Sequence, residues 1–173
     1  MKKDFVMPIL VLSLICLVIS GAMAFTYGVT EPVIERAAVQ REEEIRNSII
    51  PQATGFEMVD IDGLPATIKE VYRSINDVGY IFIIATSGYG GDMKLICGID
   101  PDGKVIHCST IEQSETKGLG ARITEERFEY QFDGADNRLD GVSAITGATI
   151  SSRAYINAIK DALTAFETVR EVG

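Results

Sequence analysis

The sequence lacks the residues from which most catalytic and metal sites are built. It contains a single histidine, His107, predicted in the middle of a strand, where a lone histidine is more often packed or exposed than catalytic. No C-x-x-C pair occurs, so no zinc or iron–sulfur site is indicated. Gly118-Leu119-Gly120 is too short for a nucleotide-binding loop and follows no strand–helix unit. We therefore expect neither a catalytic residue nor a metal site.

Concentrated positive charge is also missing. The net charge is −9, and the basic residues are scattered along the chain. Nucleic-acid binding needs a basic face, so we expect no nucleic-acid partner.

Three cysteines are present, and Cys16 lies in an apolar run where it acts as a small hydrophobic residue. Cys97 and Cys108 flank a predicted hairpin. Its turn, Pro101-Asp102-Gly103, favours a type I turn followed by a glycine bulge. This register pairs Cys97 with His107 and sends the two sulfur atoms to opposite faces of the sheet. We therefore expect free thiols.

A long uncharged segment opens the chain. The 26 residues from Phe5 to Thr30 carry no charge, and about 20 apolar residues suffice to cross a bilayer. Their apolar side chains favour insertion by roughly 4 to 7 kcal/mol. Lys2 and Lys3 precede the run, so the N-terminus is expected in the cytoplasm. A cleaved signal peptide is the alternative, because Ala22-Met23-Ala24 resembles a cleavage site.

The pattern predicts a single-pass protein of the cell membrane with its main domain outside the cytoplasm. Its parts are a cytoplasmic N-terminus at 1–4, a transmembrane helix at 5–29, a stalk helix at 30–51 and an extracytoplasmic domain at 52–173. Thr30 is the predicted cap of the stalk helix, and Pro32 suits its first turn.

The remaining sequence predicts an α+β domain with an antiparallel sheet. Strand-like alternation occurs at about 68–74, 78–86, 93–100 and 104–112. Thr124 is the predicted cap of a short helix in which Phe128 and Phe132 stack. A final helix is predicted from near Ser151 or Ser152 to about Val169. Its apolar stripe comprises Ala154, Ile156, Ile159, Leu163 and Phe166.

The segment before this last helix is small and rich in hydroxyl groups. A helix N-terminus offers unpaired N–H groups to an anion, and Gly147 and Ala148 allow a bulky ligand to approach. The hydroxyl groups suit contact or ester formation with a phosphate, and they belong to Thr146, Thr149, Ser151 and Ser152. Simple capping without a ligand is the alternative interpretation.

The sequence resembles a known family over nearly the whole chain. The resemblance rests on two motifs in order, SETKGLGARI and AITGATISS, on a GYGG bend and on one N-terminal span. The sequence resembles the G subunit of the Rnf electron-transport complex and, more distantly, the C subunit of the sodium-pumping NADH:quinone reductase. Both belong to the FMN-binding-domain family. In that family a flavin transferase links FMN, through its phosphate, to the last threonine of a Ser/Thr-Gly-Ala-Thr motif. The resemblance implies covalent FMN on Thr149.

The same resemblance implies the other residues of a flavin site. It places over the flavin the loop containing Glu115, Thr116, Gly118, Leu119 and Gly120, with Tyr89 at the glycine-rich bend. It also implies roles for Thr146, Gly147, Ala148, Ser151 and Ser152 around the phosphate. Two departures occur: Lys117 replaces the usual proline, and Ser143 replaces an aspartate three residues before the motif.

The function implied is that of an electron-carrying subunit without a turnover site of its own. By resemblance, its partners are membrane, iron–sulfur and flavin subunits of a complex that couples ferredoxin:NAD electron transfer to sodium or proton export. The alternatives are a cofactor-free membrane-anchored adaptor, or a subunit of the quinone-reductase type. A pilin-like protein is a weaker alternative, because the Gly-Phe junction followed by a glutamate is missing.

Overall fold

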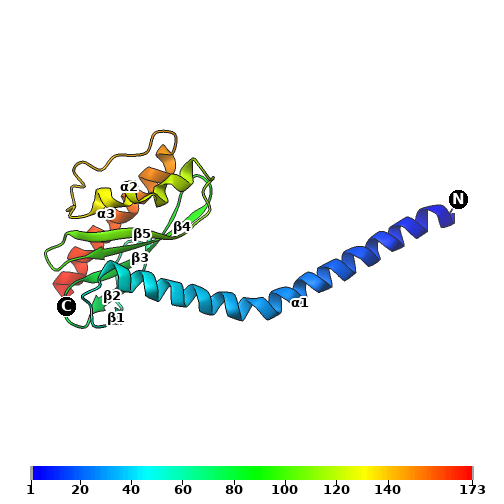
Figure 1. Ribbon diagram of the computed structural model, residues 1–173, viewed down its shortest axis with the longest axis horizontal. Coiled ribbons are helices and arrows are strands. Elements are labelled where there is room, and N and C mark those ends of the chain that lie inside the picture. Colours follow the sequence, from blue (N-terminus) through cyan, green and yellow to red (C-terminus); the bar gives the residue numbers. More distant parts are fainter. Residues whose placement is uncertain (1, 173) are drawn as a thin grey trace. The chain divides into compact units, whose positions relative to one another are not determined.

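The computed structural model describes residues 2–172, which divide into two compact units at Glu43–Glu44 (Figure 1). The elements follow the order α1 (Lys2–Ile49), β1 (Phe56–Val59), β2 (Ile68–Ser74), β3 (Tyr80–Ser87), β4 (Asp92–Ile99), β5 (Val105–Gln113) and α3 (Thr149–Val172). Three short helical turns lie between β5 and α3: η1 (Gly120–Thr124), α2 (Glu126–Glu129) and η2 (Tyr130–Phe132).

Helix α1 supplies the long apolar segment. From Val6 it is long and apolar enough to cross a membrane. The prediction that Thr30 begins a second helix is wrong, because α1 continues through Pro32. The Thr30 hydroxyl instead donates to the Thr26 carbonyl at 2.9 Å, a bond that a threonine makes inside a helix.

The second unit is built on a five-stranded antiparallel sheet in the order β1-β2-β3-β4-β5. The four predicted strands lie within one or two residues of β2 to β5, and the α+β class is confirmed. Strand β1 was not predicted, because its four residues, FEMV, are too few to display a period.

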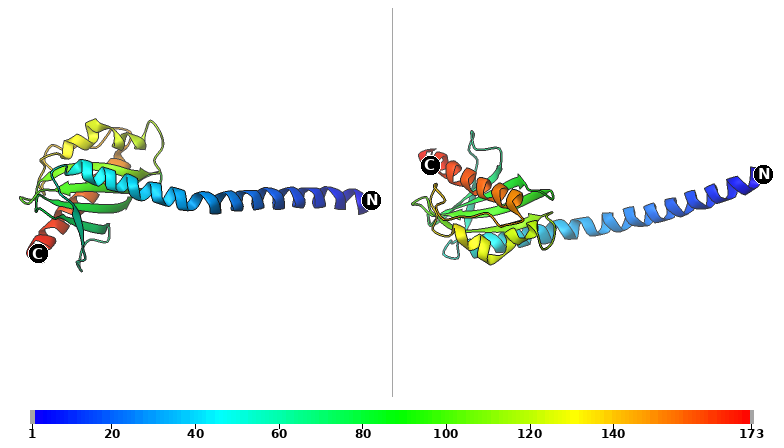
Figure 2. Two further views of the ribbon diagram at one scale, coloured as in Figure 1. Left: turned by 60° about the horizontal axis from the view of Figure 1, so that its bottom comes forward. Right: turned by 90° about the horizontal axis from the view of Figure 1, so that it is seen from above.

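The sheet buries both faces. One face packs against α3, which runs obliquely across the sheet and is coloured orange to red in Figure 2. This larger core includes Phe82, Leu95, Tyr155, Ile159 and Phe166. The opposite face packs Ile81, Ile83 and Ile96 against Ile49 and Ile50. Strand β3 therefore reads YIFIIATS, an almost continuous apolar run.

The predicted register of the two cysteines is wrong. The turn itself matches the prediction, since Asp100 and Lys104 close it and Gly103 has a φ of +83°. A second irregularity follows between Gly98 and Ile99, where the register shifts by one residue. Cys97 therefore faces Cys108 on the same side of the sheet, and both are free thiols within the core.

The helical segments after β5 differ from prediction at their starts. Thr124 caps no helix, because α2 begins after Glu125 and the Thr124 hydroxyl donates to the Ala121 carbonyl at 2.9 Å. Phe128 and Phe132 do meet, edge to face, with ring centroids 5.6 Å apart. Helix α3 begins at Thr149 rather than at Ser151 or Ser152. Its buried stripe also includes Tyr155, which the sequence pattern had not singled out.

Candidate functional site

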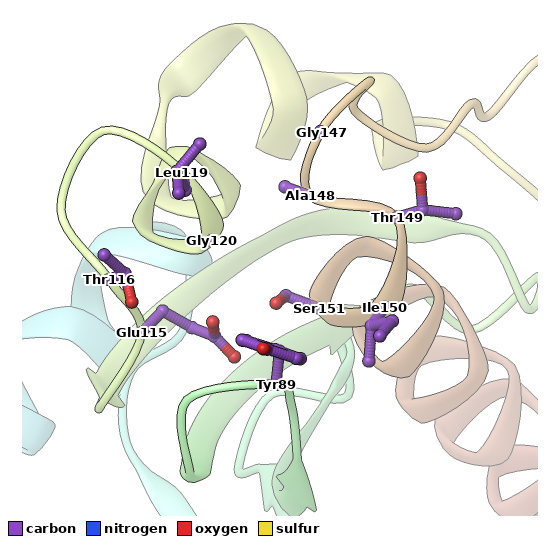
Figure 3. Close-up of a pocket in the computed structure, with 10 residues that line it drawn as sticks. All are labelled: Tyr89, Glu115, Thr116, Leu119, Gly120, Gly147, Ala148, Thr149, Ile150 and Ser151. Carbon is purple, nitrogen blue, oxygen red and sulfur yellow. The ribbon is translucent and has the colours of Figure 1, made fainter.

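A hollow of about 300 Å³ lies where three loops of the second unit meet (Figure 3). The first loop is the bend between β3 and β4, the second is the segment from the end of β5 to η1, and the third is the start of α3. Ten residues line the hollow: Tyr89, Glu115, Thr116, Leu119, Gly120, Gly147, Ala148, Thr149, Ile150 and Ser151. The volume is at the lower end of the range for small-molecule sites.

The turn before α3 is held by the side chain of Ser152. Its hydroxyl donates to the Ala148 carbonyl at 2.9 Å and accepts the N–H of Ile145 at 3.1 Å. Gly147 has a φ of +85°, a conformation that other residues rarely adopt. This turn ends with Ala148, so that Thr149 becomes the first residue of α3.

The start of α3 is suited to an anion. Within the described chain, the backbone N–H groups of Thr149, Ile150 and Ser151 donate no hydrogen bond to the protein. The first N–H of the helix that is bonded is that of Ser152, to Ala148 at 2.9 Å. Unpaired N–H groups and the helix dipole stabilise an exposed anion by about 0.3 to 1 kcal/mol. That is too little to retain a dissociable ligand by itself.

The Thr149 side chain lies at the rim of the hollow. It is exposed, and within residues 2–172 its hydroxyl makes no hydrogen bond. Figure 3 shows it directed away from Glu115, whereas Ser151 is directed toward the interior of the hollow. The Thr149 hydroxyl is thus the accessible one, and Ser151 is buried.

Three large apolar side chains surround the hollow and remain exposed. Tyr89 is 75% exposed, Leu119 is 55% exposed and Ile150 is 59% exposed. Each comes from a different loop, and together they form an apolar rim. Exposed apolar side chains that gather at a concave surface are typical of a binding site, whereas isolated ones are not informative.

Glu115 is the charged residue of this lining, and it is buried, with 7% of its surface exposed. Its Oε1 accepts the N–H of Gly90 at 3.1 Å, which ties the loop after β5 to the bend between β3 and β4. Within the described chain, Oε2 has no hydrogen-bond partner.

The hollow brings together most of the residues predicted for a flavin site. Three of the predicted residues do not line it: Gly118, Thr146 and Ser152. Ser152 is fully buried with its hydroxyl engaged in the turn, and Thr146 faces a second hollow. Ile150 lines the site although it was not predicted. An apolar residue among hydroxyl-bearing neighbours at a helix start is the signal that could have identified it.

The second hollow, which Thr146 faces, is polar. It is lined by Arg122, Glu125, Arg127, Phe128, Gln131, Ser143, Ala144, Ile145 and Thr146. Ser143 donates its N–H and hydroxyl to Gln131 Oε1 at 3.0 and 3.1 Å. Here Ser143 shapes the loop that leads to the motif.

His107 lies apart from the candidate site. Its Nδ1 is 2.8 Å from Asp133 Oδ1, and its ring packs against that of Tyr130. Between residues 2 and 172, no group of three or more His, Cys, Asp or Glu side chains could hold a metal ion. The candidate site itself has an apolar rim and lies beside the N-terminus of α3.

Comparison with known proteins identifies the family to which the chain is similar. Residues 88–164 match the FMN-binding domain family. The chain is 35% identical to the G subunit of the ion-translocating oxidoreductase complex of Methanosarcina acetivorans, covering 94% of each protein. It is 29% identical to the G subunit of the proton-translocating ferredoxin:NAD(+) oxidoreductase complex of Clostridium ljungdahlii, covering 88% of this chain and 86% of that protein. It is also 29% identical to the Na(+)-translocating counterpart of Acetobacterium woodii, covering 92% and 90%.

Proposed function

Because the chain belongs to the family of G subunits of Rnf-type ion-translocating oxidoreductase complexes, we propose that it is a membrane-anchored electron-transfer subunit carrying FMN. It serves a complex that couples electron transfer between ferredoxin and NAD to export of sodium or protons. The chain has no turnover site of its own, and its partners are the other membrane, iron–sulfur and flavin subunits.

The observation that carries this proposal is the combination of an apolar rim and a helix start in one hollow. A flavin has a flat apolar ring at one end and a phosphate at the other. Tyr89, Leu119 and Ile150 offer apolar surface to the ring. The unpaired N–H groups of Thr149, Ile150 and Ser151 offer donors to the phosphate. The residues present therefore fit FMN.

Thr149 is the proposed attachment residue. Its exposed hydroxyl is the one at the helix start that a flavin transferase can reach. In the linking step Thr149 Oγ1 forms a bond to the phosphorus of an FMN phosphoanhydride and loses its proton. The anhydride P–O bond breaks, and the leaving phosphate takes up a proton. No oxidation or reduction is involved.

Once bound, FMN supplies transfer of one or two electrons, and the protein fixes and tunes it. The ester bond prevents loss of the cofactor on the extracytoplasmic side and keeps it near its redox partners. Helix α1 anchors the domain in the membrane with its N-terminus in the cytoplasm. The buried hydroxyl of Ser152 holds the turn that presents Thr149.

Intact mass and in-gel flavin fluorescence of the whole protein, coexpressed with a flavin transferase, test this proposal. We expect wild type to gain the mass of one FMN ester, and we expect Thr149→Ala to lose both mass and fluorescence. Thr164→Ala is the matched control, because this exposed threonine lies on α3 outside the motif and does not line the hollow; it should keep the flavin. A colourless wild type, or a fluorescent Thr149→Ala, would contradict the proposal and favour the cofactor-free adaptor.

A further inference from the structure

Glu115 carries a buried carboxylate oxygen with no partner at the hollow. The residue is 7% exposed, and its Oε2 makes no hydrogen bond within the described chain. A buried polar atom without a partner destabilises the folded protein, and more so when it is charged. Native proteins rarely retain such an atom unless something pairs with it. Oε2 is therefore an acceptor available to a ligand.

The position of this carboxylate is fixed from two sides by glycines. A Cβ atom built on Gly88 would lie 2.0 Å from Oε1, and one built on Gly120 would lie 2.0 Å from Oε2. A third glycine, Gly90, donates its N–H to Oε1 at 3.1 Å. The absence of side chains at these positions makes room for a carboxylate at the hollow.

The position of Glu115 in the hollow determines which part of the bound ligand lies next to it. In Figure 3 Glu115 lies across the hollow from Thr149, next to Tyr89. If the phosphate is held at Thr149, the sugar chain leads into the hollow and the ring lies at the side of Glu115. The outer edge of the flavin ring carries one imide N–H, which is a hydrogen-bond donor.

We propose that Glu115 Oε2 accepts a hydrogen bond from the imide N–H of the flavin ring and that this carboxylate lowers the midpoint potential of the flavin. The inference rests on the proposed function. A hydrogen bond to an ionised acceptor is about twice as strong as one between neutral groups. A fixed negative charge beside the ring also opposes the negative charge that the ring gains on reduction, and this effect is strongest in a site of low dielectric constant. Glu115 thus orients the ring and makes it a stronger electron donor.

The first test is a redox titration of the FMN-loaded protein and its Glu115→Gln variant. Glutamine keeps the volume and an oxygen for the Gly90 N–H, but it places an amide N–H₂ where the flavin needs an acceptor. We expect flavin content to be retained. At a fixed potential the ratio of reduced to oxidised flavin should rise about tenfold, which for a two-electron couple equals about 30 mV.

Glu112→Gln is the matched control, because Glu112 lies on β5 and is exposed, and it does not line the hollow. It removes the same charge three residues earlier and should leave the ratio unchanged. An equal ratio in Glu115→Gln and wild type would overturn the inference, as would an equal shift in both variants.

A second measurement needs no variant and so does not depend on whether Glu115→Gln folds. Nuclear magnetic resonance of wild type loaded with ¹⁵N-labelled flavin reports the imide proton directly. We expect this proton to exchange with water at least tenfold more slowly than in free FMN. Exchange as fast as in free FMN would overturn the inference while leaving covalent FMN intact. A wild type without FMN would instead overturn the proposed function.

Discussion

The sulfur atoms of Cys97 and Cys108 lie 2.8 Å apart, directly across β4 and β5. Both side chains are fully buried in the core between the sheet and α3. Burial is the main cause that raises the pKa of the Cys108 thiol well above its usual value, and the neighbouring Cys97 adds to the effect. A thiol with a raised pKa is a poor nucleophile, because the thiolate is the reactive form.

We therefore predict that neither core thiol reacts with an alkylating reagent in the folded protein. Peptide mapping after alkylation near pH 8, close to the usual pKa of a cysteine, should find Cys97 and Cys108 unmodified in the native state and both modified after unfolding. Modification in the native state would contradict the predicted protection. Failure to modify them after unfolding without reductant would show that they had formed a disulfide.

A second prediction concerns the fit between Gly120 and Glu115. In Gly120→Ala the new Cβ atom overlaps the carboxylate, which Gly88 confines on its other side. Such overpacking costs about 1 to 3 kcal/mol of the free energy of unfolding, measured by urea denaturation of the whole protein in detergent. In a Glu115→Ala background, where the carboxylate is absent, the cost of Gly120→Ala should largely disappear.

Gly118→Ala provides the comparison for this cycle. A Cβ on Gly118 would meet open space, but its φ of +78° disfavours any other residue. Its cost of about 1 kcal/mol should be the same with and without Glu115. Equal costs of Gly120→Ala in the two backgrounds would mean that the two residues are not coupled.

A third prediction concerns Glu129, which is buried and accepts hydrogen bonds from the N–H and hydroxyl of Thr110 at 2.9 and 3.0 Å. Burial raises the pKa of Glu129 above its usual 4.5. The folded state therefore favours the protonated carboxyl group. The stability that this group contributes is fully present below its usual pKa and is lost as pH rises through its pKa in the folded protein.

Glu129→Gln keeps an acceptor for Thr110 but has no proton to lose. Its free energy of unfolding relative to wild type should therefore increase from about pH 4 to about pH 7. Urea denaturation at both pH values measures this difference, and Glu126→Gln, at an exposed position, should show no such trend. A constant difference across this range would mean that Glu129 titrates in the folded protein as it does in the unfolded one.

Most of the sheet could be predicted from local patterns. The alternation of apolar and polar residues and the turn residues that end each strand lie within a few positions of each other. The turn residues alone did not predict which residue of β5 pairs with Cys97. Gly98, which stands beside the register shift, lies against a residue distant in sequence: a Cβ atom built on it would lie 2.4 Å from the Ile49 side chain. No local signal near the hairpin reports that contact.

The candidate site, too, could be predicted only in part from the sequence. The motifs identified the loops, and nine of the twelve predicted residues lie around one hollow in the structure. The sequence could not reveal that the Ser152 hydroxyl is hydrogen-bonded within the turn or that α3 begins at Thr149. Both features accompany the hydrogen bond from the Ile145 N–H to the Ser152 hydroxyl, which no local pattern predicts. Nor could the sequence reveal the unpartnered oxygen of Glu115, whose burial depends on glycines from two different loops.

The sequential order of the five strands has a consequence for assembly. Every strand pairs with its neighbour in the chain, so the sheet can form by adding one strand after another, with short loops to close. The hollow cannot form in this way, because its third wall belongs to α3, which follows all five strands in the chain. A transferase that requires the finished cleft would thereby act only after α3 has packed against the sheet.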